Sequence, residues 1–142
     1  MKAATAYERK GQVYIHSLSK TVTGMWIFSE PVLMHPVEDT DRIGQSLRIA
    51  LDSMKENVPH PTNWGTLTAP LLNRSGVGSY NTFAKSAKCV EVRSENGMIV
   101  LTPTRNGGTN TGFAHLNEKK IEISEASESL GEKLKMAFAL CE

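Results

Sequence analysis

The chain has 142 residues, 39% of them hydrophobic and 22% charged, a composition that is typical of globular proteins and excludes an intrinsically disordered chain. This length suits one domain over residues 1–142 that folds without a metal or a disulfide. Lys and Arg number 16 and Asp and Glu 15, so the net charge of +1 argues against a protein dominated by nucleic-acid binding.

The N-terminal segment carries charged residues where a secretory signal peptide needs an apolar core, namely Glu8, Arg9 and Lys10. No apolar run approaches the roughly 18 residues that a membrane helix needs. The cysteines, Cys89 and Cys141, fit free thiols in a reducing compartment. These features predict a cytoplasmic protein that makes no contact with a membrane.

Three strands and a helix are predicted in the first half of the chain. The segments 13–18, 25–29 and 32–34 are apolar or rich in β-prone residues. The helix begins at Thr40, its expected N-cap, and runs to residue 54. Its apolar residues recur with a period of about 3.6. They are Ile43, Leu47, Ala50, Leu51 and Met54.

The connector 55–88 is predicted to contain short helices that pack on the sheet. Val58-Pro-His-Pro-Thr62 cannot be helical, because its prolines restrict the backbone. One short helix is expected after Trp64. A second one is expected after Ser79, which is a suitable N-cap.

The second half predicts strands at 89–93, 98–102 and 120–124, and Glu95-Asn96-Gly97 is a strong hairpin turn between the first two. A second amphipathic helix is predicted to begin at Ser127. Its apolar residues repeat the helical spacing of the first half. They are Leu130, Leu134, Ala137, Phe138 and Cys141.

The two predicted helices resemble each other in sequence, with residues 40–51 matching 127–138 at a constant offset. Gly44 and Gly131 occupy equivalent places, and each costs about 1 kcal/mol in a helix. A glycine that is unfavourable in both helices favours close helix packing over a phosphate-binding role. The predicted fold is therefore α+β: an antiparallel sheet built from two β-β-β-α repeats, with the helices on one face. The repeats span 13–54 and 89–141, and the connector 55–88 lies between them.

No sequence motif for catalysis or metal binding is present. The four histidines, His16, His35, His60 and His115, lack the spacing of metal ligands. No nucleophile motif accompanies them. We therefore expect no metal, no cofactor and no enzymatic activity. The loop 102–112 could bind an anion on its backbone amides near Arg105, or could be a plain exposed connection.

Acidic residues gather where the two predicted helices begin. These are Glu38, Asp39, Asp41, Glu122, Glu125, Glu128 and Glu132. They could serve capping and solvation, or could form an acidic face for a basic partner. The basic residues Lys85, Lys88, Arg9 and Lys10 would equally suit RNA binding, although aromatic residues for base stacking are scarce.

Several segments resemble a family of immunity proteins from contact-dependent growth inhibition (CDI) systems. The resemblance covers the chain from about residue 9 to its end. It rests on the segments 13–27, 58–62 with Trp64, 83–90 and 103–106, and on the Leu-Gly-x-x-Leu-x-x-Ala helix before Cys141-Glu142. It implies a cytoplasmic protein that binds and blocks the C-terminal toxin domain delivered by a neighbouring bacterium. It also implies that the toxin is a nuclease, one cleaving tRNA being the leading case.

The leading hypothesis is thus a non-enzymatic immunity protein whose partner is its cognate toxin domain. The residues predicted to face the toxin are Asp39, Asp41, Glu125, Glu128 and Arg105. Trp26 or Trp64 could supply an aromatic anchor, but core packing is the favoured role for both. One alternative is a small RNA-binding module. Another is a small hydrolase or transferase in which Arg105 holds an anion beside a histidine and a carboxylate.

Overall fold

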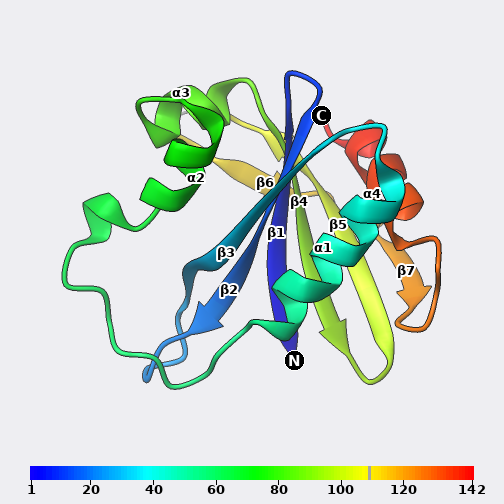
Figure 1. Ribbon diagram of the computed structural model, residues 1–142, viewed down its shortest axis with the longest axis horizontal. Helices are drawn as coiled ribbons and strands as arrows, with labels where there is room; N and C mark the ends of the chain where they lie inside the picture. Colours follow the sequence, from blue (N-terminus) through cyan, green and yellow to red (C-terminus); the bar gives the residue numbers. More distant parts are fainter. Residues whose placement is uncertain (109) are drawn as a thin grey trace.

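The computed structural model describes residues 1–108 and 110–142 (Figure 1). Its centre is a sheet with the strand order β3-β2-β1-β4-β5-β6, and β7 also pairs with β5. Every pair of neighbouring strands is antiparallel. The strands are β1 (Lys2–Arg9), β2 (Gln12–Lys20), β3 (Trp26–Pro36), β4 (Lys88–Glu95), β5 (Met98–Asn106), β6 (Phe113–His115) and β7 (Ile121–Ser124). The predicted α+β class is confirmed.

Two longer helices follow the two halves of the sheet, and shorter ones fill the connector (Figure 1). The α-helices are α1 (Thr40–Asp52), α2 (Ala69–Ser75), α3 (Tyr80–Lys85) and α4 (Leu130–Leu140). Two short 3-10 helices, η1 (Trp64–Thr66) and η2 (Asn117–Lys119), complete the elements.

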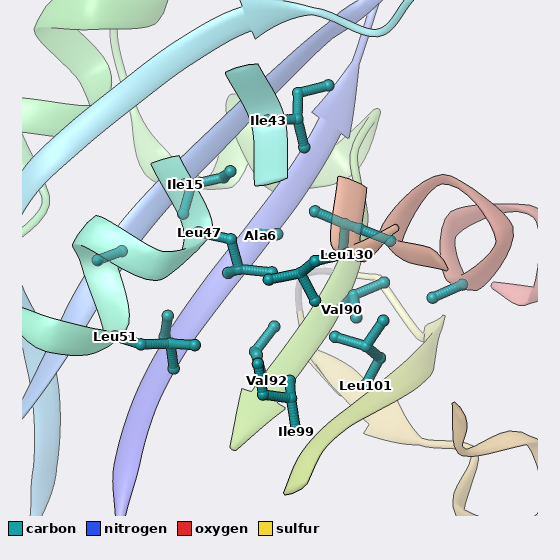
Figure 2. Packing of buried hydrophobic residues seen from close by; sticks show 14 of the residues in the cluster. Ala6, Ile15, Ile43, Leu47, Leu51, Val90, Val92, Ile99, Leu101 and Leu130 are labelled. Carbon is teal, nitrogen blue, oxygen red and sulfur yellow. The ribbon is translucent and has the colours of Figure 1, made fainter. Parts of the chain in front are cut away.

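The main core lies between the sheet and the pair α1 and α4. Figure 2 shows Ile43, Leu47 and Leu51 of α1, with Leu130 at the start of α4, directed toward the sheet. The sheet supplies alternate residues of its central strands, as the period of two along a strand requires. These include Ala6, Ile15, Val90, Val92, Ile99 and Leu101. The predicted apolar stripes are confirmed within both helices, whereas Met54 and Cys141, their predicted last members, lie beyond the helix ends and are only half-buried.

A second cluster lies on the opposite face of the sheet, under α2 and α3. Leu71 and Phe83, both fully buried, pack against Tyr7, Tyr14 and Cys89. The connector therefore packs on the sheet as predicted. The two repeat helices, α1 and α4, lie on one face as predicted, and the connector helices cover the other face, because the alternation along each central strand leaves apolar residues on both faces.

Three strand predictions are wrong in detail. Strand β1 was not predicted, and it is the central strand that pairs with both β2 and β4. The segments 25–29 and 32–34 form one strand, β3. The predicted loop 102–112 is a strand as far as Asn106, because its first residues pair with β4 and β6. Of the remainder of that loop, Thr109 lies outside the described residues.

Both helices begin at residues other than the predicted caps. The N-cap of α1 is Asp39, whose side chain accepts a hydrogen bond from the backbone N–H of Arg42 at 3.5 Å. The N-cap of α4 is Ser129, two residues after Ser127. The hydroxyl of Ser127 accepts the backbone N–H of Ser129 instead, within a turn.

The hairpins of the two halves correspond closely. Strands β1 and β4 begin 86 residues apart, and so do β2 and β5. Both hairpins turn through two residues of positive φ, Lys10-Gly11 in one and Asn96-Gly97 in the other. The correspondence between the two halves thus begins at β1, before the predicted repeat boundary at residue 13. The division into repeats over 13–54 and 89–141 stays a prediction.

Candidate functional site

The N-terminal turns of α1 and α4 meet at their two glycines. A Cβ atom on Gly44 would lie 3.1 Å from the backbone nitrogen of Gly131. A Cβ atom on Gly131 would overlap the carbonyl oxygen of Thr40. Close helix packing, the favoured explanation of these glycines, is confirmed. The contact brings two acidic segments that are far apart in sequence to one place.

Beside this contact lies an open hollow of about 460 Å³. Three predicted toxin-facing carboxylates, those of Asp41, Glu125 and Glu128, line it, and all three residues are exposed. Gln45 and Ser127 add polar groups to the wall. We call this feature the acidic hollow. Its carboxylates come from α1 and from the segment between β7 and α4, so the fold and not the sequence order assembles it.

Arg48 of α1 ties the two sides of the acidic hollow together. Its guanidinium donates hydrogen bonds to the backbone carbonyls of Glu125 and Ser127. Arg48 also lines the hollow. Because a guanidinium presents its donors in a rigid planar fork, this contact fixes the backbone that carries Glu125 and Glu128. Sequence reasoning missed Arg48, whose partners are main-chain atoms that no residue pattern reveals.

Replacing Arg48 by Met is expected to loosen the segment between β7 and α4. Two hydrogen bonds, each worth about 1 kcal/mol, are lost, so amide exchange near Ser127 should rise by about thirtyfold. Hydrogen–deuterium exchange with mass spectrometry measures this. Arg42→Met is the matched control, because among the described residues the ion-pair partner of Arg42 is its own helix cap, Asp39. Equal exchange in both variants would show that Arg48 does not hold the segment.

The other two predicted toxin-facing residues lie outside the hollow. Asp39 caps α1 and pairs with Arg42 at 3.6 Å. Arg105 lies on β5, where its Nη2 is 2.7 Å from the Glu142 carboxylate. Hydrogen bonds from Lys119 and then from Arg105 lower the pKa of Glu142 to about 2. The structure therefore brings together three of the five predicted residues, and the toxin-facing roles of all five stay predictions.

A family model described as CDI immunity protein matches residues 2–141. The chain belongs to the CDI immunity protein family. Its function is therefore immunity against the toxin of a contact-dependent growth inhibition system, and the toxin is its partner. The resemblance seen in the sequence is confirmed.

Solved structures support the fold of this immunity protein. A protein of unknown function, NMB0488 from Neisseria meningitidis, is 17% identical with a TM-score of 0.82, and the match covers 99% of this chain and 95% of that one. A CdiA-CT/CdiI toxin and immunity complex from Yersinia pseudotuberculosis is 12% identical with a TM-score of 0.79, and the match covers 99% and 97%. No curated protein matches the chain.

The alternative functions find less support in the arrangement of side chains. Lys88 pairs with Glu8 at 3.9 Å and Arg105 pairs with Glu142, so two of the residues proposed for RNA or anion binding have acidic partners. In the described part of the immunity protein, no group of three or more His, Cys, Asp or Glu residues could hold a metal. Within the same residues, no helix is long and apolar enough to cross a membrane.

The two tryptophans lie outside the core of the immunity protein. Trp64 in η1 is 53% exposed. Trp26 at the start of β3 is half-buried, with the charged groups of Lys20 and Arg93 each 5.2 Å from its ring centroid. Core packing, the role favoured for both, is therefore wrong. Trp26 is the first residue of β3 and Trp64 the first residue of η1, and a single sequence does not distinguish such an end position from a core position.

Proposed function

We propose that this immunity protein neutralises a nuclease toxin domain, one that cleaves tRNA. The carboxylates of its acidic hollow would lie against the basic groups of the toxin's cleft. The immunity protein acts in the cytoplasm, by binding and without catalysis. The supporting observation is the gathering of Asp41, Glu125 and Glu128 around one hollow from two separate segments.

The chemistry of the partner explains the choice. A nuclease that holds a phosphate backbone needs a cationic cleft. Carboxylates placed against such a cleft speed the encounter and occupy the groups that would bind the phosphates. A standard interface buries about 1,600 Å² in total, so the hollow would be one part of a larger contact surface.

Neutralising the hollow is expected to weaken the toxin complex. The triple variant D41N/E125Q/E128Q should bind the toxin domain about ten- to hundredfold more weakly and should lose most of the salt dependence of association. Titration calorimetry and stopped-flow association at two salt concentrations measure both effects. A tRNA cleavage assay with the isolated toxin domain, with and without the immunity protein, tests its activity as a nuclease.

A second triple variant controls for net charge. E30Q/E56Q/E118Q changes the charge by the same amount at exposed acids that do not line the acidic hollow. This variant should retain wild-type affinity. If the two triple variants behave alike, overall charge and not the hollow governs binding. Separate Asp39→Asn and Arg105→Ala variants test the two remaining predicted contacts.

A further inference from the structure

The second face of the sheet is covered by α2 and α3 over only one end. The buried cluster under these helices takes its sheet residues from the end near the Lys10-Gly11 turn, namely Tyr7, Tyr14, Val32 and Cys89. Along β4 the same face continues with Glu91 and Arg93, because side chains alternate along a strand. Both of these residues are only half-buried. The other end of this face therefore lies open beyond the helices.

An open hollow of about 410 Å³ lies on this uncovered part of the sheet. Its lining includes Arg93 on β4, Met98 and Val100 on β5, and Lys120 before β7. Met98 is 40% exposed, so an apolar side chain in this hollow is accessible to a partner. The surface thus combines apolar groups with cations, unlike the acidic hollow on the other face.

Trp26 extends this surface toward β2 and β3. Arg93 lines the hollow and also lies against the Trp26 ring, while Lys20 lies against the same ring at 5.2 Å. Contact with an aromatic ring restricts a long cationic side chain, which lowers the entropy lost when a partner binds it. Tryptophan and arginine are also the residues enriched in binding hot spots. We call Trp26 and this hollow the Trp26 surface.

Of the two carboxylates that line the hollow of the Trp26 surface, Glu91 is engaged inside the protein and Glu95 is exposed. Glu91 accepts hydrogen bonds from the Thr5 hydroxyl and the Cys89 thiol, and it lies 3.8 Å from Arg93. Among the described residues, Lys20 and Lys120 make no ion pair. A ligand with an acidic group would meet these cations without displacing an internal carboxylate.

The Trp26 surface is continuous with the acidic hollow around the turn between β4 and β5. A small hollow lined by Lys2, Ser94, Arg48 and Glu125 shares its last two residues with the acidic hollow. Its other wall, at Ser94, adjoins Glu95, which lines the Trp26 surface. One partner that wraps this end of the sheet can therefore contact both surfaces.

We infer that the Trp26 surface is a second contact surface for the toxin domain, and that it takes an acidic segment of the toxin with an adjacent apolar side chain. The net charge of +1 shows that the acidic hollow is balanced by cations elsewhere on the protein, and the Trp26 surface carries Lys20, Arg93 and Lys120. Opposite charges on the two surfaces also fix the orientation of the toxin, because a reversed orientation places like charges together. The inference rests on the toxin as partner and not on the acidic hollow.

Fluorine NMR tests the inference with the intact complex. The immunity protein is labelled with 5-fluorotryptophan, and the two resonances are assigned with Trp64→Phe. Saturation with unlabelled toxin domain is expected to shift the Trp26 resonance. An unchanged Trp26 resonance in the saturated complex would overturn the inference. So would a shift produced by RNA alone and not by the toxin, which would make the surface a nucleic-acid site.

Affinity measurements provide the second readout. R93Q/K120Q is expected to bind the toxin at least tenfold more weakly. The matched variant K55Q/K85Q also removes two positive charges, at exposed lysines outside the Trp26 surface, and should bind normally. Circular dichroism and thermal unfolding check that each variant is folded. If R93Q/K120Q binds normally, the inference fails even when the acidic triple variant binds weakly. If the acidic triple variant binds normally and R93Q/K120Q binds weakly, the proposed role of the acidic hollow fails and the inference about the Trp26 surface stands.

Discussion

Gly131→Ala is expected to lower the free energy of unfolding by about 3 kcal/mol or more, because overpacking at a backbone contact leaves no side chain that can move aside. The new Cβ atom would overlap the Thr40 carbonyl oxygen and lie 2.7 Å from its carbon. Helices α1 and α4 would have to separate, which disrupts packing among Ile43, Leu47 and Leu130. The gain of about 1 kcal/mol in helix propensity is too small to compensate.

Gly44→Ala is the matched control, since Gly44 occupies the equivalent place in the other helix. Its Cβ would approach Gly131 no closer than 3.1 Å, at the backbone nitrogen. A displacement of a few tenths of an ångström then suffices, and the gain in helix propensity offsets much of its cost. Urea unfolding of both variants should show a change within about 1 kcal/mol for Gly44→Ala. Equal losses of unfolding free energy in both variants would contradict the conclusion that the space beside Gly131 is tighter than the space beside Gly44.

The same pair of variants connects packing to binding. Thr40, Gly44 and Leu130 line the acidic hollow as well as the helix contact. A separation of α1 from α4 moves Asp41 away from Glu125 and Glu128, so Gly131→Ala should weaken toxin binding at temperatures where the protein is still folded. Gly44→Ala should leave toxin affinity near the wild-type value.

The helices could be predicted from the sequence because their signal is long and periodic. Ile43, Leu47 and Leu51 recur at the spacing that places them on one face, and all are buried. Strand β1 lacks such a signal. Ala3, Ala4 and Ala6 favour helices when taken alone, but their small side chains fit a central strand with packed layers on both faces. The two-residue turn Lys10-Gly11 was the local signal that could have revealed the hairpin.

The candidate site could be predicted only in part, because some of its contacts leave no local pattern in the sequence. Exposed acids at helix starts are visible in a sequence, and three of them do line one hollow. Arg48 and Arg93 act through a backbone carbonyl pair and an aromatic ring that lie far away along the chain. Such contacts depend on strand register and on how two helices cross, and neither is encoded by a local motif.

His16 is expected to make the protein less stable in acid by about 3 kcal/mol between pH 7.5 and pH 4. It is fully buried, stacked between Tyr7 and Phe28, and its Nδ1 donates to the Ser17 carbonyl at 2.8 Å. Burial, partly offset by that hydrogen bond, lowers the pKa of His16 from 6.5 to about 4. The unfolded chain therefore binds the proton first, and stability is lost as pH falls from 6.5 toward 4.

His16→Phe isolates this effect, because phenylalanine keeps an aromatic ring between Tyr7 and Phe28 and cannot titrate. Urea unfolding at a series of pH values should show a markedly flatter profile above pH 4 for this variant. His115→Phe, at an exposed histidine, should retain the wild-type profile. Glu142, whose pKa is lowered from 4.5 to about 2, loses its stabilisation mainly below pH 4.5, so the part of the profile above pH 5 isolates His16. An unchanged slope in His16→Phe would mean that other groups supply the acid sensitivity.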